Sequence, residues 1–448
     1  MSRHVFLENL GCAKNQVDAE IMIAALEREG WSLTPEPDQA DVILVNTCGF
    51  IEPAKQESIN TTLEYLDAYP DARIVMTGCL SQRYPEELAS ELPELAGVFG
   101  NRAPARIGEF LAQVESGGER IMVPAAGLES HPRTHLLSFP GSAFVKVSEG
   151  CDNRCSFCAI PLIRGTMRSK PIDDVVGEIE ALLDRGIREI NLVAQDLASY
   201  GRDFTARRGA PVPDAAAPEA LLKRISALPG EFWVRLLYVY PERFPHAFFP
   251  ILRDDPRLLP YFDIPFQHAS SEVLRRMGRP GNAERYLELV RTIRSELPDA
   301  VIRSTLLVGF LGETDAAFEE LLRFQDAAQL DWLGVFPYSP EEGTPAMRGA
   351  PELDVTPRLA AKRARIVEER QREITHARME RLVGRELDVL VEELVPDEPL
   401  AIGRCYAHAP EVDGSVVINV PEGEVTPGSF VRCRIIRRNG LDVEAVPL

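Results

Sequence analysis

Short apolar runs alternate with longer helical patterns along most of this chain, and that alternation constrains its fold more than any other feature. Three apolar runs of strand character open the sequence, at residues 4–10, 41–47 and 73–78. Helical patterns follow them, as at residues 18–30 and 54–66. Strand–helix alternation is typical of parallel sheets covered by helices on both faces. We therefore expect an N-terminal parallel α/β domain over residues 1–125.

A second and longer series of the same kind begins near residue 138. Its six strand-like runs lie at residues 143–149, 189–195, 233–239, 261–266, 301–310 and 333–339. Helical patterns separate them, for example at residues 171–186 and 283–297. Six β/α units are two short of an eightfold barrel. Residues 138–378 are therefore expected to form an open, partial (β/α)6 barrel.

The remaining segments have different patterns. Residues 201–220 are rich in Ala, Pro and Gly and predict a surface loop. Residues 358–382 predict a long charged helix that bridges to the next domain and whose charges form a solvated face. Short alternating runs with turn signals over residues 380–448 predict a small C-terminal β-barrel of OB-like type. Cys405 and Cys433 fall within these runs, so we interpret them as core residues.

Three cysteines, Cys151, Cys155 and Cys158, follow the first strand of the partial barrel with the spacing C-x-x-x-C-x-x-C. Three thiolates on one short loop can hold three irons of a 4Fe–4S cluster and leave the fourth iron open to a small molecule. A zinc site is the main alternative, with His131 and His135 as further ligands, although structural zinc usually takes its four ligands as two separated pairs. A structural disulfide is a third interpretation.

Three other cysteines, Cys12, Cys48 and Cys79, each come directly after one of the first three strand-like runs. The ends of parallel strands share one edge of the sheet, and ligands bind at that edge. We therefore expect these cysteines to converge in space and to hold a second iron–sulfur cluster. The alternative is that they are buried and act as small hydrophobic side chains.

The chain is strongly acidic. Its 49 basic and 69 acidic residues give a net charge of −20, and from residue 380 onward 7 basic residues face 13 acidic ones. Such a balance does not favour direct nucleic-acid binding and suits a basic partner, although acidity that only maintains solubility is an equal alternative. The N-terminus does not have the pattern of a signal peptide, and no run is long enough to span a membrane. Eight cysteines in such a chain indicate a reducing compartment, so we expect a cytoplasmic protein.

The cysteine triplet at the end of the first barrel strand resembles the radical S-adenosylmethionine superfamily. The order of a cysteine-bearing domain, a radical domain and a terminal β-barrel resembles the methylthiotransferases of that superfamily, whose last domain is the TRAM domain. Within them, five segments resemble the RimO-type branch: GCAKNQVDAE (11–20), NTCGFIEPAKQES (46–58), CSFCAIPLIRGTMRS (155–169), FDIPFQHAS (262–270) and PYSPEEGTPA (337–346). One departure is Leu311, where the family commonly has proline. This change affects a turn and removes no reacting group.

The resemblance implies methylthiolation of the β-carbon of an aspartate on the twelfth small-subunit ribosomal protein, a basic substrate. It implies two 4Fe–4S clusters and two uses of S-adenosylmethionine, one as a methyl donor and one as a source of a radical that abstracts the β-hydrogen. The chemistry needs an electron donor, flavodoxin-like or ferredoxin-like, whose identity the sequence does not indicate. Three alternatives remain: a tRNA methylthiotransferase of the same architecture (MiaB-like), an iron–sulfur electron carrier or scaffold, and a zinc-stabilised RNA-binding protein.

The resemblance also assigns residues. Cys151, Cys155 and Cys158 correspond to the ligands of the radical cluster, and Cys12, Cys48 and Cys79 to those of the auxiliary cluster. The positions expected near S-adenosylmethionine are Phe157, Gln195, Asp196, Gly309, Gly312 and Glu313, where Phe157 has loop packing as an equal interpretation and glycines allow close backbone approach. Arg164 and Gln267 are candidates to face the substrate. No catalytic residue is expected beyond the cluster ligands.

Overall fold

The computed structural model describes residues 3–125, 127, 131–205, 217–349, 355–420 and 425–448. The N-terminal domain is a six-stranded parallel sheet in the order β2-β1-β3-β4-β5-β6. Its strands are β1 (Arg3–Asn9), β2 (Trp31–Leu33), β3 (Val42–Thr47), β4 (Arg73–Thr77), β5 (Gly97–Gly100) and β6 (Ile121–Met122). The three predicted strands are confirmed as β1, β3 and β4. All six residues of β3 are buried, as expected for a parallel strand covered on both faces.

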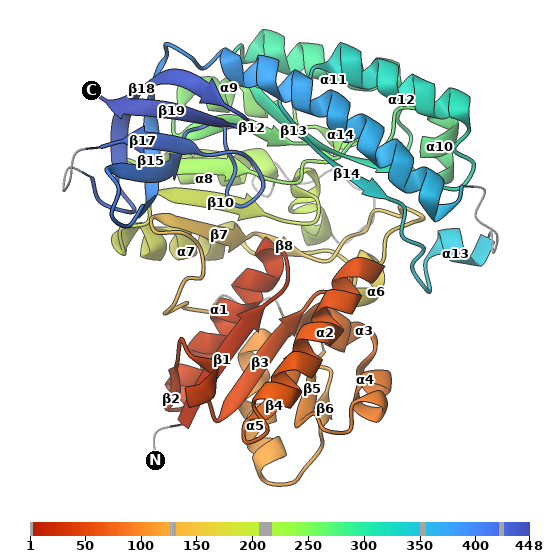
Figure 1. Cartoon of the computed structure of the whole chain (residues 1–448), viewed down its shortest axis with the longest axis vertical. Helices are drawn as coiled ribbons and strands as arrows, with labels where there is room; N and C mark the ends of the chain where they lie inside the picture. Colours follow the sequence, from red (N-terminus) through yellow and green to blue (C-terminus); the bar gives the residue numbers. More distant parts are fainter. Residues whose placement is uncertain (1–2, 126, 128–130, 206–216, 350–354, 421–424) are drawn as a thin grey trace.

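The helices of this domain are α1 (Ala13–Arg28), α2 (Glu52–Ala68), α3 (Gly78–Arg83), α4 (Pro85–Glu91) and α5 (Ile107–Glu115). Helix α1 differs from an ordinary surface helix because its polar residues are buried as well as its apolar ones, among them Lys14, Asn15, Asp18 and Glu20. The helix lies at the boundary with the central domain (Figure 1). Burial on two sides explains why it has no clear polar face.

The central domain is an open sheet of six parallel strands, in the order β14-β13-β12-β11-β10-β7, as the partial barrel predicted. The strands are β7 (Ser142–Lys146), β10 (Glu189–Val193), β11 (Trp233–Leu236), β12 (Leu258–Asp263), β13 (Val301–Val308) and β14 (Trp332–Pro337). The main helices are α7 (Ile172–Asp184), α8 (Pro218–Ser226), α9 (Phe248–Asp254), α11 (Ala283–Glu296), α12 (Asp315–Ala328) and α14 (Pro357–Glu380). Short elements complete it: β8 (Ser148–Glu149), β9 (Arg168–Ser169), α6 (Ile160–Ile163), α10 (Ser271–Arg276) and α13 (Pro345–Gly349).

The loop predicted over 201–220 is wrong at its C-terminal end, because α8 begins at Pro218, a residue that suits the first turn of a helix. Within that loop, a 3-10 turn covers Arg202–Phe204, and residues 206–216 lie outside the described ranges. The long charged helix is confirmed as α14. None of the helices in the described ranges combines the length and apolar character that a bilayer crossing needs.

The C-terminal segment is a closed five-stranded barrel, as predicted, in the order β15-β16-β17-β19-β18. Its strands are β15 (Glu386–Leu394), β16 (Leu400–Arg404), β17 (Val416–Asn419), β18 (Phe430–Asn439) and β19 (Asp442–Pro447). Cys405 and Cys433 are fully buried, which confirms them as core residues, although Cys405 lies one position beyond β16. The barrel lies beside the central sheet (Figure 1), and residues of both share one hydrophobic cluster.

Candidate functional site

The structure brings Cys12, Cys48 and Cys79 to one edge of the N-terminal sheet. Cys12 precedes α1, Cys48 follows β3, and Cys79 lies in the first turn of α3 directly after β4. Strands β1, β3 and β4 are adjacent and parallel, so their carboxyl ends meet at the same edge. Desolvation and, to a smaller extent, the charge of the neighbouring Cys79 raise the pKa of Cys48 to about 12. The three thiols are therefore close enough to affect one another's charge.

The environment of this triplet is not uniform. Cys79 is buried, Cys48 is partly buried and Cys12 is exposed. Desolvation by the surrounding protein raises the pKa of Cys12, but the charges of Lys14 and Arg164 lower it, and the net shift is downward. The side chains of Asn101 and Arg164 donate to Cys79 Sγ over 3.2 and 3.4 Å. Donors of this kind stabilise a thiolate, the form in which cysteine binds metal.

Cys151, Cys155 and Cys158 lie on a loop between β8 and α6 at the carboxyl end of β7. The loop is fixed by backbone hydrogen bonds, from Cys151 N to Gly165 O over 3.1 Å and from Cys158 N to Cys155 O over 3.2 Å. All three side chains are partly buried. Desolvation raises the pKa of Cys151 to about 11 and also raises the pKa values of Cys155 and Cys158. A bound metal would supply the positive charge that deprotonates such thiols.

The six cysteines offer thiols as ligands, and thiolates are the usual ligands of iron–sulfur clusters. All six cysteines are free of disulfides. Across the described ranges, no three His, Cys, Asp or Glu side chains surround one position as ligands of a single metal ion would. The zinc alternative gains no support from His135, whose Nε2 lies 2.6 Å from Glu27 Oε1.

A buried ionic network joins the two cysteine sites. Arg164 is almost fully buried, and its Nη1 lies 3.0 Å from Asp18 Oδ2 and 2.9 Å from Glu149 Oε2. Lys146 pairs with the same two carboxylates. Arg164 and Lys146 lower the pKa of Glu149 against the opposing effect of desolvation. Arg164 follows the loop of Cys151, Cys155 and Cys158 in sequence and contacts Cys79 of the other triplet, so this network lies between the segments that carry the two sites.

Gln195 and Asp196 extend from the end of β10 toward the loop that carries Cys151. Asp196 Oδ2 accepts hydrogen bonds from Asn153 over 2.9 Å and from Arg243 over 2.6 Å. Gln195 donates to Glu149 over 3.0 Å. Gln195 Oε1 and Asp196 Oδ1 are buried without a hydrogen-bond partner among the described residues. Buried acceptors are normally satisfied, and a bound molecule with N–H or O–H donors would complete them.

The turn after β13 holds the other predicted cofactor positions. Glu313 is buried, accepts a hydrogen bond from Gly309 N over 2.7 Å and pairs with Arg363 of α14 over 2.7 Å. Gly309 and Gly312 have φ angles of +78° and +76°. Phe157 packs edge-on against Phe310, with ring centroids 6.2 Å apart. Glu313 and Phe157 thus have structural contacts of their own, and their role toward a cofactor stays a prediction.

Sequence reasoning missed two residues near the triplets. Lys14 is buried, donates to Ala194 O over 3.1 Å and lies with its Nζ 3.9 Å from the centroid of the Tyr238 ring. Lys14 stands two positions after Cys12, a signal that could have been used. Tyr238 and Gln267, just beyond β11 and β12, have φ angles of +63° and +68°. Such angles are unusual for residues other than glycine and often mark functional sites. Gln267 is already a substrate-facing candidate from the sequence, whereas no sequence pattern indicates Tyr238.

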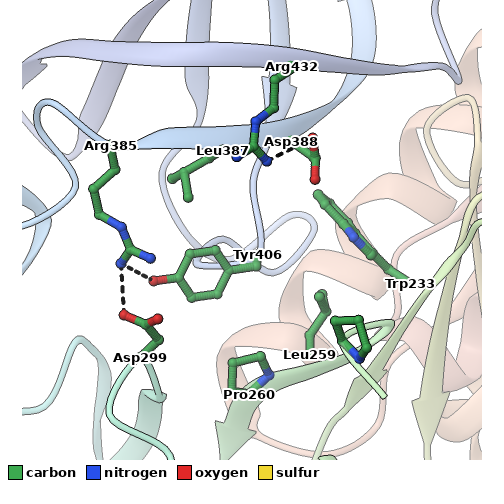
Figure 2. Close-up of a pocket in the computed structure, with 10 residues that line it drawn as sticks. Trp233, Leu259, Pro260, Asp299, Arg385, Leu387, Asp388, Tyr406 and Arg432 are labelled. Atoms are coloured by element: carbon green, nitrogen blue, oxygen red, sulfur yellow. Dashed lines mark hydrogen bonds and ion pairs between the residues drawn. The ribbon is translucent and has the colours of Figure 1, made fainter. Parts of the chain in front are cut away.

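A groove of about 200 Å³ lies elsewhere, between the central sheet and the C-terminal barrel (Figure 2). Its residues from the central domain stand at the amino ends of strands, so the groove is at the opposite end of the sheet from the cysteines. Arg385 pairs with Asp299 over 2.9 Å and donates to Tyr406 over 3.1 Å (Figure 2). The groove is lined by Trp233, Pro256, Leu259, Pro260, Asp299, Arg385, Leu387, Asp388, Tyr406 and Arg432.

Comparison with known families divides the chain as the fold does. Residues 4–100 match the family described as "Uncharacterized protein family UPF0004", residues 145–324 match the radical SAM superfamily, and residues 383–448 match the TRAM domain. The solved structure of the radical S-adenosylmethionine methyltransferase TsrM from Kitasatospora setae is similar over 76% of this chain and 77% of its own, with a TM-score of 0.54 and 17% identity. At that identity the likeness concerns the fold alone.

Curated relatives are similar over nearly the whole chain. Proteins named "Ribosomal protein uS12 methylthiotransferase RimO" are 42% identical in Treponema denticola, over 97% of this chain and 99% of the relative, and 43% identical in Sorangium cellulosum, over 99% and 90%. The fold, the cysteine-bearing loop and these matches define a radical S-adenosylmethionine methylthiotransferase that uses an iron–sulfur cluster and S-adenosylmethionine. Within that class, the chain belongs to the RimO family.

Proposed function

We propose that this enzyme attaches a methylthio group to the β-carbon of an aspartate on ribosomal protein uS12 and that it uses two 4Fe–4S clusters. The observation that carries the proposal is the pair of cysteine triplets joined by the Arg164 network. Cys151, Cys155 and Cys158 would hold the radical cluster, and Cys12, Cys48 and Cys79 the auxiliary cluster. Together with S-adenosylmethionine, these groups would supply hydrogen abstraction, methyl transfer and sulfur.

The residues around the clusters would position the reactants. The unpartnered oxygens Gln195 Oε1 and Asp196 Oδ1 are suited to donors on S-adenosylmethionine. Asp196 also holds Asn153, which stands between Cys151 and Cys155, so it would fix the cysteine loop relative to the cofactor. Arg164 and Lys146 would hold the N-terminal and central domains in a fixed relative position, because each pairs with one carboxylate from either domain.

The charge of the C-terminal barrel favours a protein substrate over tRNA. Each of the seven arginines from residue 380 onward pairs with a carboxylate: Arg381, Arg385, Arg404, Arg432, Arg434, Arg437 and Arg438. Pairing leaves little positive surface for phosphates. Exposed Glu393, Asp397 and Glu398, near the β15–β16 turn, form no ion pair within the described ranges. A basic ribosomal protein in the cytoplasm suits this acidic surface.

The decisive experiment is the intact mass of uS12 after anaerobic incubation with reconstituted enzyme, S-adenosylmethionine, sulfide and a chemical reductant. A gain of one methylthio group, mapped to an aspartate, is expected. If uS12 gains no mass while 5′-deoxyadenosine still forms, the proposed substrate is wrong. Methylthiolation of tRNA under the same conditions would establish the alternative.

The acidic surface has its own test. Replacement of Glu393, Asp397 and Glu398 by lysine should weaken uS12 binding while leaving 5′-deoxyadenosine formation without substrate unchanged. Unchanged affinity for uS12 would show that the barrel does not recruit the substrate by charge. The intact-mass experiment can also be run with reduced flavodoxin or ferredoxin in place of the chemical reductant. We propose that one of these two proteins is the electron donor.

A further inference from the structure

Three lysines are buried in the part of the chain that the structure describes, and one of them differs from the other two. Lys146 pairs with Asp18 and Glu149, and Lys170 pairs with Glu178 over 2.7 Å. Lys14 is 5% exposed, and no carboxylate in the described ranges lies within ion-pair distance of its Nζ. A buried charge without a partner is costly, and such charges are usually paired.

The contacts of Lys14 leave its ammonium only partly satisfied. The ammonium has three donors, and one of them binds Ala194 O over 3.1 Å. The Tyr238 ring stabilises the charge from 3.9 Å. The nearby carboxylates of Glu149 and Asp263 are held by other cations: Glu149 by Lys146 and Arg164, and Asp263 by Arg303 over 3.3 Å. The charge of a Cys12 thiolate also favours the ammonium, but Cys12 would share that charge with iron when it binds a cluster. The ammonium can then take a further anionic partner.

The position of Lys14 indicates which partner that is. Lys14 stands two residues after Cys12 of one triplet. Its bond partner Ala194 directly precedes Gln195 and Asp196, and Asp196 holds the loop of the other triplet through Asn153. The ammonium thus lies where the strand ends of the two domains meet. The reacting part of a substrate must reach this same region if it is to lie between the two clusters.

The backbone of Tyr238 supports a binding role. Its φ of +63° is a conformation that tyrosine rarely adopts, and it is maintained directly after β11. Leu197 N donates to Tyr238 O over 2.9 Å, which links this strained residue to the end of β10. Strain of this kind persists where the surrounding structure enforces it and is concentrated at ligand sites. Here it holds an aromatic ring against a buried cation.

We propose that Lys14 binds the side-chain carboxylate of the substrate aspartate. The inference rests on the proposed function and specifies how that substrate is recognised. The aspartate carboxylate is bonded directly to the β-carbon, so an ion pair with Lys14 holds that carbon in place between the clusters. An asparagine at the same position has no charge to pair, and the ion pair therefore selects aspartate over asparagine. The carboxylate of S-adenosylmethionine has the same chemistry and is the other source that the test must separate.

The test is a double-mutant cycle on the reconstituted full-length enzyme. Wild type, Lys14→Met and Lys14→Arg are each titrated with uS12 and with uS12 whose target aspartate is replaced by asparagine. A charged hydrogen bond predicts that wild type prefers the aspartate form by about 10- to 100-fold. Lys14→Met should bind both forms equally, and Lys14→Arg should restore most of the preference. Lys362→Met, at an exposed lysine, is the control and should match wild type.

Further measurements separate the outcomes. Iron content and circular dichroism establish that each variant is folded and loaded, and Lys14→Arg keeps the test valid if Lys14→Met does not fold. If Lys14→Met retains the preference for aspartate, the inference is wrong. If instead its KM for S-adenosylmethionine rises in substrate-free 5′-deoxyadenosine formation, the carboxylate is that of the cofactor and the inference is also wrong. If wild type does not methylthiolate uS12 at all, it is the proposed function that fails.

Discussion

Glu189 of the central sheet and Arg404 of the C-terminal barrel are joined by two hydrogen bonds, of 2.5 and 3.0 Å, and both side chains are buried. Arg235 approaches the same carboxylate over 3.0 Å and also donates to Tyr406 O over 2.9 Å. Desolvation opposes ionisation of Glu189, but the charges of the two arginines have the larger combined effect and lower the pKa of Glu189 to about 2. Glu189 thus contacts two buried cations and connects two domains, and Glu392 also pairs with Arg404 over 2.6 Å.

We predict that Glu189→Gln lowers the free energy of unfolding by about 3–5 kcal/mol, because it leaves the buried Arg235 without a carboxylate partner in the described ranges and Arg404 with Glu392 alone. Urea denaturation followed by circular dichroism measures the change. The matched control is Glu386→Gln, whose partner Arg434 is half exposed, and which should have a much smaller effect because exposed ion pairs contribute little. Equal effects of the two substitutions would contradict the role assigned to the buried pair.

The second prediction concerns acid stability and His408. Burial, together with the charges of Arg235 and Arg404, lowers the pKa of His408 from 6.5 to about 3. Between pH 6.5 and about 3, this histidine therefore binds a proton in the unfolded chain but not in the folded chain. The contribution of His408 to the free energy of unfolding is fully present above pH 6.5. It decreases as the pH falls toward 3, by up to about 1.4 kcal/mol per pH unit.

Asp413 acts in the opposite direction, because burial raises its pKa from 3.8 to about 6. Its effect is common to wild type and to His408→Gln, so their difference isolates the histidine. Denaturation midpoints from pH 7.5 to 4.5 should converge as the pH falls, with wild type losing more stability than the variant. Parallel pH profiles would mean that His408 titrates normally in the fold.

The central strands were predictable because strands buried on both faces appear as continuous apolar runs. Strands β2, β5 and β6 were missed because they contain only three, four and two residues, too few to form a pattern. In the site, cysteine spacing indicated the triplet on the loop after β8, and the position of a cysteine after each of three strand-like runs indicated the other triplet. The contact of Arg164 with Cys79 could not be predicted, because it depends on how two domains pack and not on any local sequence preference.

Helix α1 is a second case in which the sequence does not predict the contacts of a residue. Its buried polar residues would normally indicate an exposed helix face, whereas here they form the ion pairs and hydrogen bonds that join the domains, as Asp18 does with Lys146 and Arg164. A sequence pattern reports polarity but not the partner that satisfies it. Lys14 belongs to this helix, and only the structure shows that it has no carboxylate partner in the described ranges.

The third prediction tests the glycine turn after β13. A Cβ at Gly309 would lie 2.4 Å from Ala360 Cβ of α14, and its φ of +78° is also unfavourable for alanine. Gly186 has a φ of +88° but open space around the same position. Gly186→Ala should therefore cost about 1–2 kcal/mol for the backbone alone. Gly309→Ala should cost a further ~1–3 kcal/mol from overpacking. Urea denaturation measures both losses of stability. Equal losses in the two variants would show that α14 moves aside without an energetic cost.

The last prediction separates the two cysteine sites. If each triplet holds its own cluster, Cys48→Ser should remove roughly half of the iron, because each 4Fe–4S cluster contributes equally. Substrate-free 5′-deoxyadenosine formation should persist in this variant, while methylthio transfer is lost. Cys155→Ser should also remove roughly half of the iron but abolish both activities. Cys433→Ser, at a buried cysteine of the C-terminal barrel, is the control and should keep the iron content of wild type. Loss of 5′-deoxyadenosine formation in a folded Cys48→Ser variant would mean that the triplets do not act as separate sites.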